Sequence, residues 1–228
     1  MSDAGRLYIY GIVDQVSGDL GLGLEGSPLR VIKAGRVAAV ASEHVQAPES
    51  GEERFWQHEA VVERLLEEGA VLPMRFGVTV ADERALKRLL RAREEEFVGL
   101  LEVVRGAVEL SVRAELPAPE PSRVGGDDAA AQRSGTEYMR ERGRALRSVE
   151  QTKEQLHEPL KDLARRSLVL EARTAHGFEG AFRGAYLVDV ERVDAFARCV
   201  ESLAEKLGGE VSCTGPWPPY SFVDGGAR

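Results

Sequence analysis

His58 and the residues around it are the first place in this chain to look for chemistry. The four histidines are scattered, with no His-x-x-x-His pair, so the sequence indicates no local metal site. Glu59 follows His58 directly, but adjacent residues on a helix do not face each other. The helical count places His58 on the apolar face of its predicted helix, and we interpret it as a core histidine.

The candidate nucleophiles have no supporting context either. Cys199 and Cys213 are too few for a disulfide framework, and neither has a histidine within ten residues. We interpret both cysteines as small apolar residues. A catalytic partner that is distant in sequence but close in space stays open as an alternative. No Gly-x-Ser-x-Gly motif surrounds any serine. The sequence therefore predicts no catalytic set, no metal and no cofactor.

Arg75 stands in an otherwise apolar segment, between Met74 and Phe76. A buried guanidinium needs a carboxylate or carbonyl partner. One interpretation is an internal structural pair, with Glu59 or with carbonyls of the C-terminal tail. The other is a recognition arginine at a partner surface, and of the two we favour the structural pair.

The tail at residues 215–223 is uncharged and holds three of the ten prolines and one of the two tryptophans. Proline fixes φ and removes a backbone donor, so the tail is predicted to run extended. Its aromatic residues are Trp217, Tyr220 and Phe222. They either fold back on their own domain, which we favour, or present a stiff surface to a partner. We expect Pro216 and Trp217 to pack inward and Tyr220 and Phe222 to lie nearer the surface.

The periodicity of apolar residues predicts the elements that position these groups. In the first half we expect strands at 7–13, 29–34, 36–42, 71–74 and 77–80, and helices at 52–68 and 82–104. The face of the helix at 52–68 is predicted from Phe55, His58, Val62, Leu65 and Leu66. In the second half we expect strands at 108–116, 168–174, 185–190 and 210–214, and helices at 137–166, with a kink or break at Pro159, and at 191–207.

The second half has the order β-α-β-β-α-β, which is typical of a ferredoxin-like split βαβ arrangement. The fold class is therefore α+β with two domains. We predict an N-terminal α+β domain at 1–105 and a ferredoxin-like domain at 106–228. The latter includes the tail at 215–223 and a mobile loop at 117–136, which is rich in Pro, Gly and Ala.

Bulk composition excludes several classes of partner. The net charge is −8, with basic residues interleaved among acidic ones, which argues against nucleic-acid binding. No stretch approaches the ~20 apolar residues of a membrane span, and the first residues have no signal-peptide pattern. We expect a cytoplasmic protein that has no membrane partner.

Several blocks resemble a known family. Gly-Pro-Trp-Pro-Pro-Tyr-Ser-Phe at 215–222 is similar to the ending of the gas vesicle protein F/L family. His-Glu-Ala-Val-Val at 58–62, followed by Val-Leu-Pro-Met-Arg-Phe-Gly at 71–77, resembles two further family blocks. The segments at 7–13 and 185–188 are similar to its strands. The resemblance covers almost the whole chain.

The resemblance implies an accessory or minor structural component of gas vesicles and no reaction. It further implies binding to the apolar major shell protein or to other accessory proteins, and a place at the gas vesicle inside the cell. The residues we expect at the partner surface are Arg75, Phe76, Trp217, Pro218, Pro219, Tyr220 and Phe222.

The alternative is an enzyme or small-ligand binder built on the ferredoxin-like domain, a fold that supports many unrelated activities. It requires a pocket in which His58, Arg75 and Cys213 converge from separate elements.

Overall fold

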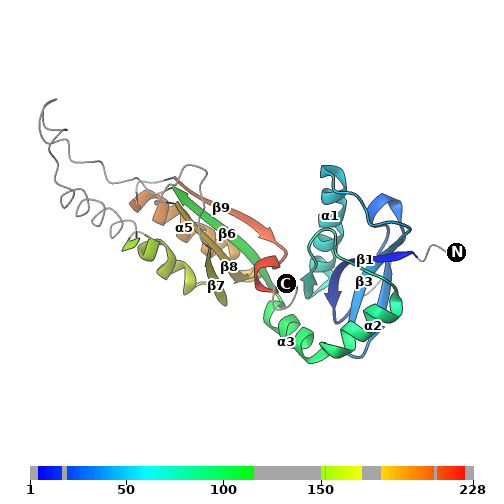
Figure 1. Ribbon diagram of the computed structural model, residues 1–228. Coiled ribbons are helices and arrows are strands. Elements are labelled where there is room, and N and C mark those ends of the chain that lie inside the picture. Colours follow the sequence, from blue (N-terminus) through cyan, green and yellow to red (C-terminus); the bar gives the residue numbers. More distant parts are fainter. Residues whose placement is uncertain are drawn as a thin grey trace, which may run out of the picture. The chain divides into compact units, whose positions relative to one another are not determined.

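The computed structural model describes residues 5–16, 20–115, 150–151, 153–170, 181–207 and 210–223. The chain forms two compact units (Figure 1). The first unit is Met1–Glu109 together with Pro216–Arg228, and the second unit is Leu110–Gly215. The tail thus belongs to the first unit, whereas the sequence analysis assigned it to the C-terminal domain. The predicted loop at 117–136 lies outside the described residues.

The first unit contains an antiparallel sheet of order β2-β3-β1-β4, with β5 also pairing with β1. Its strands are β1 (Arg6–Val13), β2 (Arg30–Ala34), β3 (Val37–His44), β4 (Val71–Pro73) and β5 (Thr79–Val80). Helix α1 (Glu52–Glu68) covers one face, and α2 (Glu83–Ala92) and α3 (Glu94–Val104) cover the other (Figure 1). A short 3-10 turn, η1 (Leu24–Gly26), packs against α1.

The helix predicted at 82–104 is in fact two helices. Asp82 caps α2 as expected, because its Oδ1 accepts the Ala85 N–H at 2.6 Å. Arg93 leaves the helical region, with φ −119° and ψ 21°, and its carbonyl accepts the Phe97 N–H to start α3. The carboxylates at 94–96 lie in the first turn of α3, where their negative charge stabilises the N-terminus of the helix.

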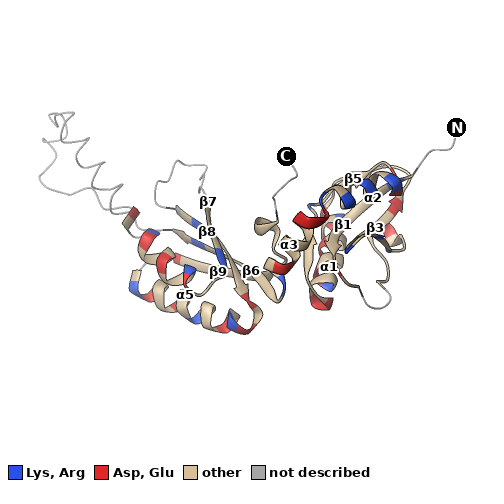
Figure 2. Ribbon diagram, turned by 90° about the horizontal axis from the view of Figure 1, so that it is seen from below, with Lys and Arg blue, Asp and Glu red and all other residues tan. Residues whose placement is uncertain are grey.

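The second unit carries a sheet of order β7-β8-β6-β9. Its strands are β6 (Ala107–Glu115), β7 (Arg166–Leu170), β8 (Ala181–Asp189) and β9 (Glu210–Trp217). Residues 153–161 are helical, and with α5 (Val193–Leu207), which follows the 3-10 turn η2 (Val190–Arg192), they pack on one face (Figures 1 and 2). The element order and this sheet confirm the ferredoxin-like α+β prediction. Of the predicted kink or break at Pro159, the break does not occur, because the helix continues through this proline to residue 161.

A hydrogen-bonded histidine sits at the centre of the first unit. His58 is completely buried, with Nδ1 2.9 Å from Tyr8 Oη and Nε2 2.9 Å from the Met74 carbonyl oxygen. A carbonyl only accepts, so Nε2 carries the hydrogen and Nδ1 accepts from the tyrosine hydroxyl. Tyr8 Oη in turn accepts the Gly77 N–H at 3.1 Å. The interpretation of His58 as a core histidine is confirmed.

A second buried chain runs beside it. The Leu24 N–H donates to Tyr10 Oη at 2.7 Å, and Tyr10 Oη lies 2.9 Å from Ser42 Oγ. Ser42 Oγ is 2.8 Å from His44 Nε2. Tyr10 also stacks on the His58 ring, with centroids 5.4 Å apart. The two tyrosines of β1 therefore connect the sheet to both η1 and α1.

The tail closes over the first unit. Phe222 is buried, and the Tyr220 hydroxyl donates to Glu59 Oε1 at 2.9 Å. Ser221 donates its N–H and its hydroxyl to the two carboxylate oxygens of Glu109, at 2.8 and 2.7 Å. Glu109 is therefore buried, with its two carboxylate oxygens satisfied. Donors from the tail satisfy a carboxylate that burial otherwise penalises.

The expected packing of the tail is wrong in detail. Pro216 and Trp217 are exposed, whereas Pro218, Pro219 and Phe222 are buried and Tyr220 is half-buried. The backbone is extended in β9 as far as Trp217 and then forms a 3-10 turn, η3 (Tyr220–Phe222). The turn arises because the Phe222 N–H returns to the Pro219 carbonyl at 3.2 Å.

The buried His58 predicts acid destabilisation. Burial lowers the pKa of His58 from 6.5 to about 4. Because the unfolded chain binds this proton at a higher pH than the folded one, stability is fully present above pH ~6.5 and falls as the pH decreases towards 4. We expect a loss of roughly 3 kcal/mol over this range, measured by urea unfolding followed by intrinsic fluorescence. Both tryptophans lie in the first unit, so the signal reports on it.

His58→Gln keeps a donor and an acceptor but does not titrate, so it is the matched variant. Its unfolding free energy should depend less on pH over the same range. An unchanged slope in His58→Gln would assign the acid sensitivity to other groups, among them His44 and His157, whose pKa values burial also lowers.

The tail yields a second prediction. Phe222→Ala should lower the free energy of unfolding by about 3 kcal/mol, because it leaves a cavity in the first unit. Trp217→Ala should lower it by less than about 1 kcal/mol, because this side chain is 42% exposed. Thermal melts followed by circular dichroism test both. Equal losses in the two variants would show that the tail does not pack as described.

Candidate partner-binding surface

Most of the predicted tail residues face their own unit. Pro218, Pro219 and Phe222 are buried, and the Tyr220 hydroxyl is engaged by Glu59. Burial raises the pKa of Tyr220, so its phenol keeps its proton at neutral pH and donates to Glu59, whose pKa burial also raises. Of the predicted tail residues, Trp217 is the exposed one.

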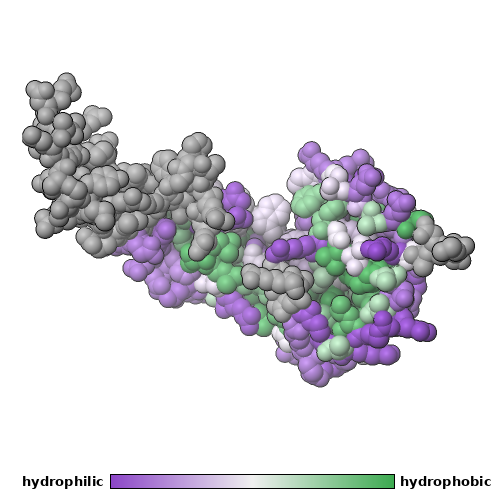
Figure 3. All heavy atoms as spheres, in the orientation of Figure 1, coloured by the Kyte–Doolittle hydropathy of each residue, from purple (hydrophilic) through white to green (hydrophobic). Residues whose placement is uncertain are grey.

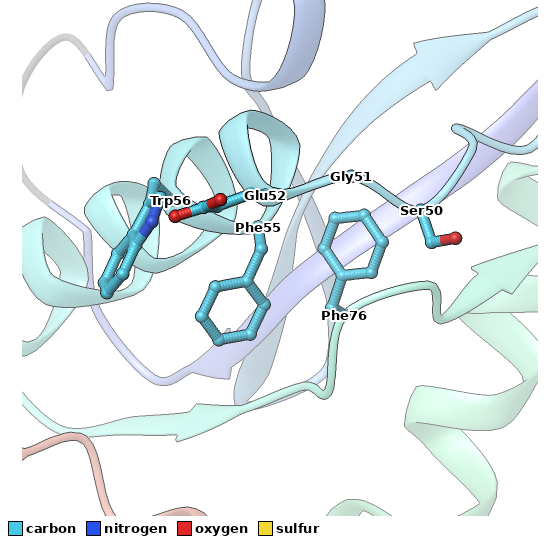
Figure 4. A pocket seen from close by; sticks show the side chains of 6 residues that line it. All are labelled: Ser50, Gly51, Glu52, Phe55, Trp56 and Phe76. Atoms are coloured by element: carbon cyan, nitrogen blue, oxygen red, sulfur yellow. The ribbon is translucent and has the colours of Figure 1, made fainter.

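Three aromatic side chains form an exposed depression on the first unit, here called the aromatic surface: Phe55, Trp56 and Phe76. The rings of Phe55 and Trp56 have centroids 5.6 Å apart, and those of Phe55 and Phe76 lie 6.3 Å apart. Ser50, Gly51 and Glu52 complete the lining (Figure 4). Hydrophobic side chains are visible at the surface of this unit, surrounded by hydrophilic ones (Figure 3).

The aromatic surface rests on the buried network. Phe76 follows Met74, whose N–H donates to the Tyr10 carbonyl at 2.8 Å and whose own carbonyl accepts from His58. Gly77, next in the chain, has φ +92°, a left-handed conformation that disfavours a side chain. The Phe76 ring meets His58 edge to face, with centroids 5.8 Å apart. Hydrogen bonds to buried residues therefore fix the backbone of this loop, while the Phe76 ring is partly exposed.

Sequence reasoning found only part of this surface. Phe76 was predicted, and it is partly exposed as a partner residue requires. Phe55 was placed on the buried face of α1 but is 43% exposed, and Trp56 was missed although it is 58% exposed. The available signal was a tryptophan among acidic residues on a helix. Periodicity does not detect it, because Phe76, which lines the same depression, comes from a loop distant in sequence.

Arg75 is exposed rather than buried. Glu59, one of its suggested partners, accepts a hydrogen bond from Tyr220. The Arg75 carbonyl accepts the Val78 N–H at 3.3 Å, which closes the turn after β4.

One cluster has the layout of a nucleophilic triad. Ser42 Oγ lies 2.8 Å from His44 Nε2, and His44 Nδ1 lies 3.7 Å from Glu25 Oε2. Ser42 is, however, completely buried, and its oxygen is also bonded to Tyr10. A substrate carbonyl has no access to this serine, and the cluster is best explained as structural.

His58 and Cys213, which the alternative enzyme pocket requires, belong to different units, and each packs within its own. His58 is completely buried with both ring nitrogens bonded inside the first unit. Cys213 packs against the core of the second unit, where burial raises its pKa and so disfavours the thiolate. Within the described ranges, no group of three or more His, Cys, Asp or Glu residues is arranged to hold a metal ion. Across those same residues, no helix has the length and apolarity needed to cross a membrane.

Comparison with known proteins identifies the family. The sequence model described as gas vesicle synthesis protein GvpL/GvpF matches residues 6–224. Gas vesicle protein F1 of Halobacterium salinarum is 30% identical, over 96% of this chain and 93% of that protein. Gas vesicle protein L of a Streptomyces species is also 30% identical, over 95% and 92% of the two chains.

Solved structures agree with the fold. The crystal structure of GvpF from Anabaena superposes with a TM-score of 0.80 at 20% identity, covering 96% of each chain. That of GvpF from Microcystis aeruginosa gives a TM-score of 0.77 at 18% identity, covering 96% of this chain and 99% of the other. The relatives are structural and accessory proteins of gas vesicles rather than known enzymes, and this chain has a gas vesicle-related role. It belongs to the GvpL/GvpF family of gas vesicle synthesis proteins.

Proposed function

We propose that this protein binds the major gas vesicle shell protein, or fellow accessory proteins, and supports the nucleation or assembly of the shell. It acts in the cytoplasm and at the gas vesicle. The observation that carries the proposal is the aromatic surface of Phe55, Trp56 and Phe76 on a rigid support.

The physical reason is protection of apolar surface. Shell subunits that are not yet assembled expose apolar area, which drives aggregation unless a partner covers it. Aromatic side chains supply a large contact area with little loss of conformational entropy. The net charge of −8 counteracts association of the resulting complexes with one another.

The partner surface in this proposal differs from the one expected from sequence. Exposed Arg75, Phe76 and Trp217 are retained, and Phe55 and Trp56 are added. The buried tail residues Pro218, Pro219 and Phe222, with half-buried Tyr220, act indirectly by closing the first unit. The rival enzymatic role loses support, because both ring nitrogens of His58 are hydrogen-bonded inside the first unit and Cys213 packs against the core of the second.

The test is capture of gas vesicle proteins by the full chain. Co-expression with the shell protein and with each accessory protein should show at least one stable complex in a pull-down. Trp56→Ala should weaken that complex at least about tenfold without lowering the melting temperature, since an exposed anchor contributes to binding rather than to folding. Leu89→Ala is the matched control, because Leu89 is an exposed apolar residue of α2 at 39%.

Two results would contradict the proposal. The first is that no gas vesicle protein associates with the wild-type chain. The second is that Trp56→Ala binds as tightly as Leu89→Ala, which would place the interface elsewhere.

A further inference from the structure

We infer that the partner segment bound by the aromatic surface carries an arginine or lysine, whose cationic group sits between Trp56 and the carboxylates of Glu52 and Glu53. The inference rests on the proposed function, because it names the chemistry of the partner at the same site. Three observations lead to it, concerning the lining, the charges and the exposed rings.

Two neighbouring depressions, one apolar and one acidic, share part of their lining. The aromatic surface is lined by one charged residue, Glu52. A neighbouring depression shares Gly51 and Glu52 with it and is otherwise lined by Glu25, Glu53, Arg54 and Gln57. A segment that crosses both depressions therefore meets aromatic rings first and carboxylates next. An apolar residue beside a basic one fits that order.

The charges of these carboxylates are not neutralised nearby. Within the part of the chain that the structure describes, neither Glu52 nor Glu53 has a basic partner, and Glu53 contacts the Gln57 amide at 3.5 Å. Arg54, the adjacent cation, is engaged elsewhere, with Nε 2.8 Å from Glu25 Oε1. The charge of Glu25 is thereby neutralised. The charges of Glu52, which lines the aromatic surface, and of Glu53, which lines the neighbouring depression, remain.

The rings add a second attraction for a cation. Glu52 and Glu53 precede Trp56 by four and three residues, so all three share one side of α1. Trp56 is 58% exposed, and the indole face is the best aromatic partner for a guanidinium or ammonium group. The aliphatic stem of such a side chain can lie along Phe55, whose ring is next to Trp56 (Figure 4).

Other partners fit less well. An acidic segment is repelled by Glu52 and Glu53. A wholly apolar segment removes water from both carboxylates without supplying a counter-charge, which is unfavourable. A basic residue next to apolar ones offsets this cost and uses the rings as well. Charge complementarity therefore selects a basic, amphipathic protein segment.

The test uses the full wild-type chain, and binding is measured by isothermal titration calorimetry. The probes are two short amphipathic peptides with the same leucine face, one with arginines on the other face and one with citrulline, its neutral isostere. The arginine peptide should bind at least about tenfold more tightly at low salt, and the difference should shrink as salt rises.

Charge variants locate the effect. Glu52→Gln with Glu53→Gln should abolish the preference for the arginine peptide. Glu63→Gln with Glu67→Gln removes the same charge from the same helix, outside the lining of both depressions, and should leave the preference intact. Equal binding of the two peptides, or equal effects of the two variants, would overturn the inference.

The same variants separate this inference from the proposed function. If Trp56→Ala abolishes capture of gas vesicle proteins but Glu52→Gln with Glu53→Gln does not, the function stands and the cationic anchor is wrong. If the arginine preference appears but no gas vesicle protein is captured, the surface chemistry stands and the function is wrong. Self-association of the wild type that Trp56→Ala abolishes would make a second copy the occupant and overturn the inference.

Discussion

The buried imidazole of His58 is the interaction on which the first unit depends. It joins α1 to Tyr8 of β1 through one nitrogen and to Met74, just after β4, through the other. Both nitrogens are used only if the ring is neutral, and burial enforces that state by lowering its pKa to about 4. One side chain thereby sets the distance between a helix, a strand and a loop.

The aromatic surface is the outer layer of this arrangement. From the interior outward, the Tyr10 ring stacks on His58 with centroids 5.4 Å apart, and His58 contacts the Phe76 ring with centroids 5.8 Å apart. Phe55 and Trp56 extend the series along α1 to the exterior. Because the inner members are hydrogen-bonded, the outer rings are positioned before any partner arrives. A preorganised surface loses less entropy on binding than a flexible one.

The tail shows how an aromatic and proline-rich motif serves structure and surface together. Its donors satisfy the two carboxylates of Glu59 and Glu109, and Phe222 is buried. Pro218 and Pro219 are buried, and because proline has no backbone N–H, neither needs a hydrogen-bond acceptor there. Only Trp217 of the aromatic set is left facing outward. The tail is thus an integral part of the first unit rather than an appendage of the second.

Local periodicity was enough to determine the elements. The bounds of α1 coincide with the prediction, and the order β-α-β-β-α-β was evident because burial of one face imposes a regular spacing on apolar residues. Sequence blocks likewise determined the family. The burial of Glu109 and the inward direction of the tail depended on tertiary structure. So did the meeting of Trp56 with Phe55 and Phe76 at an exposed depression. Each results from contacts between residues distant along the chain, and no periodic pattern records which distant residue will supply the partner.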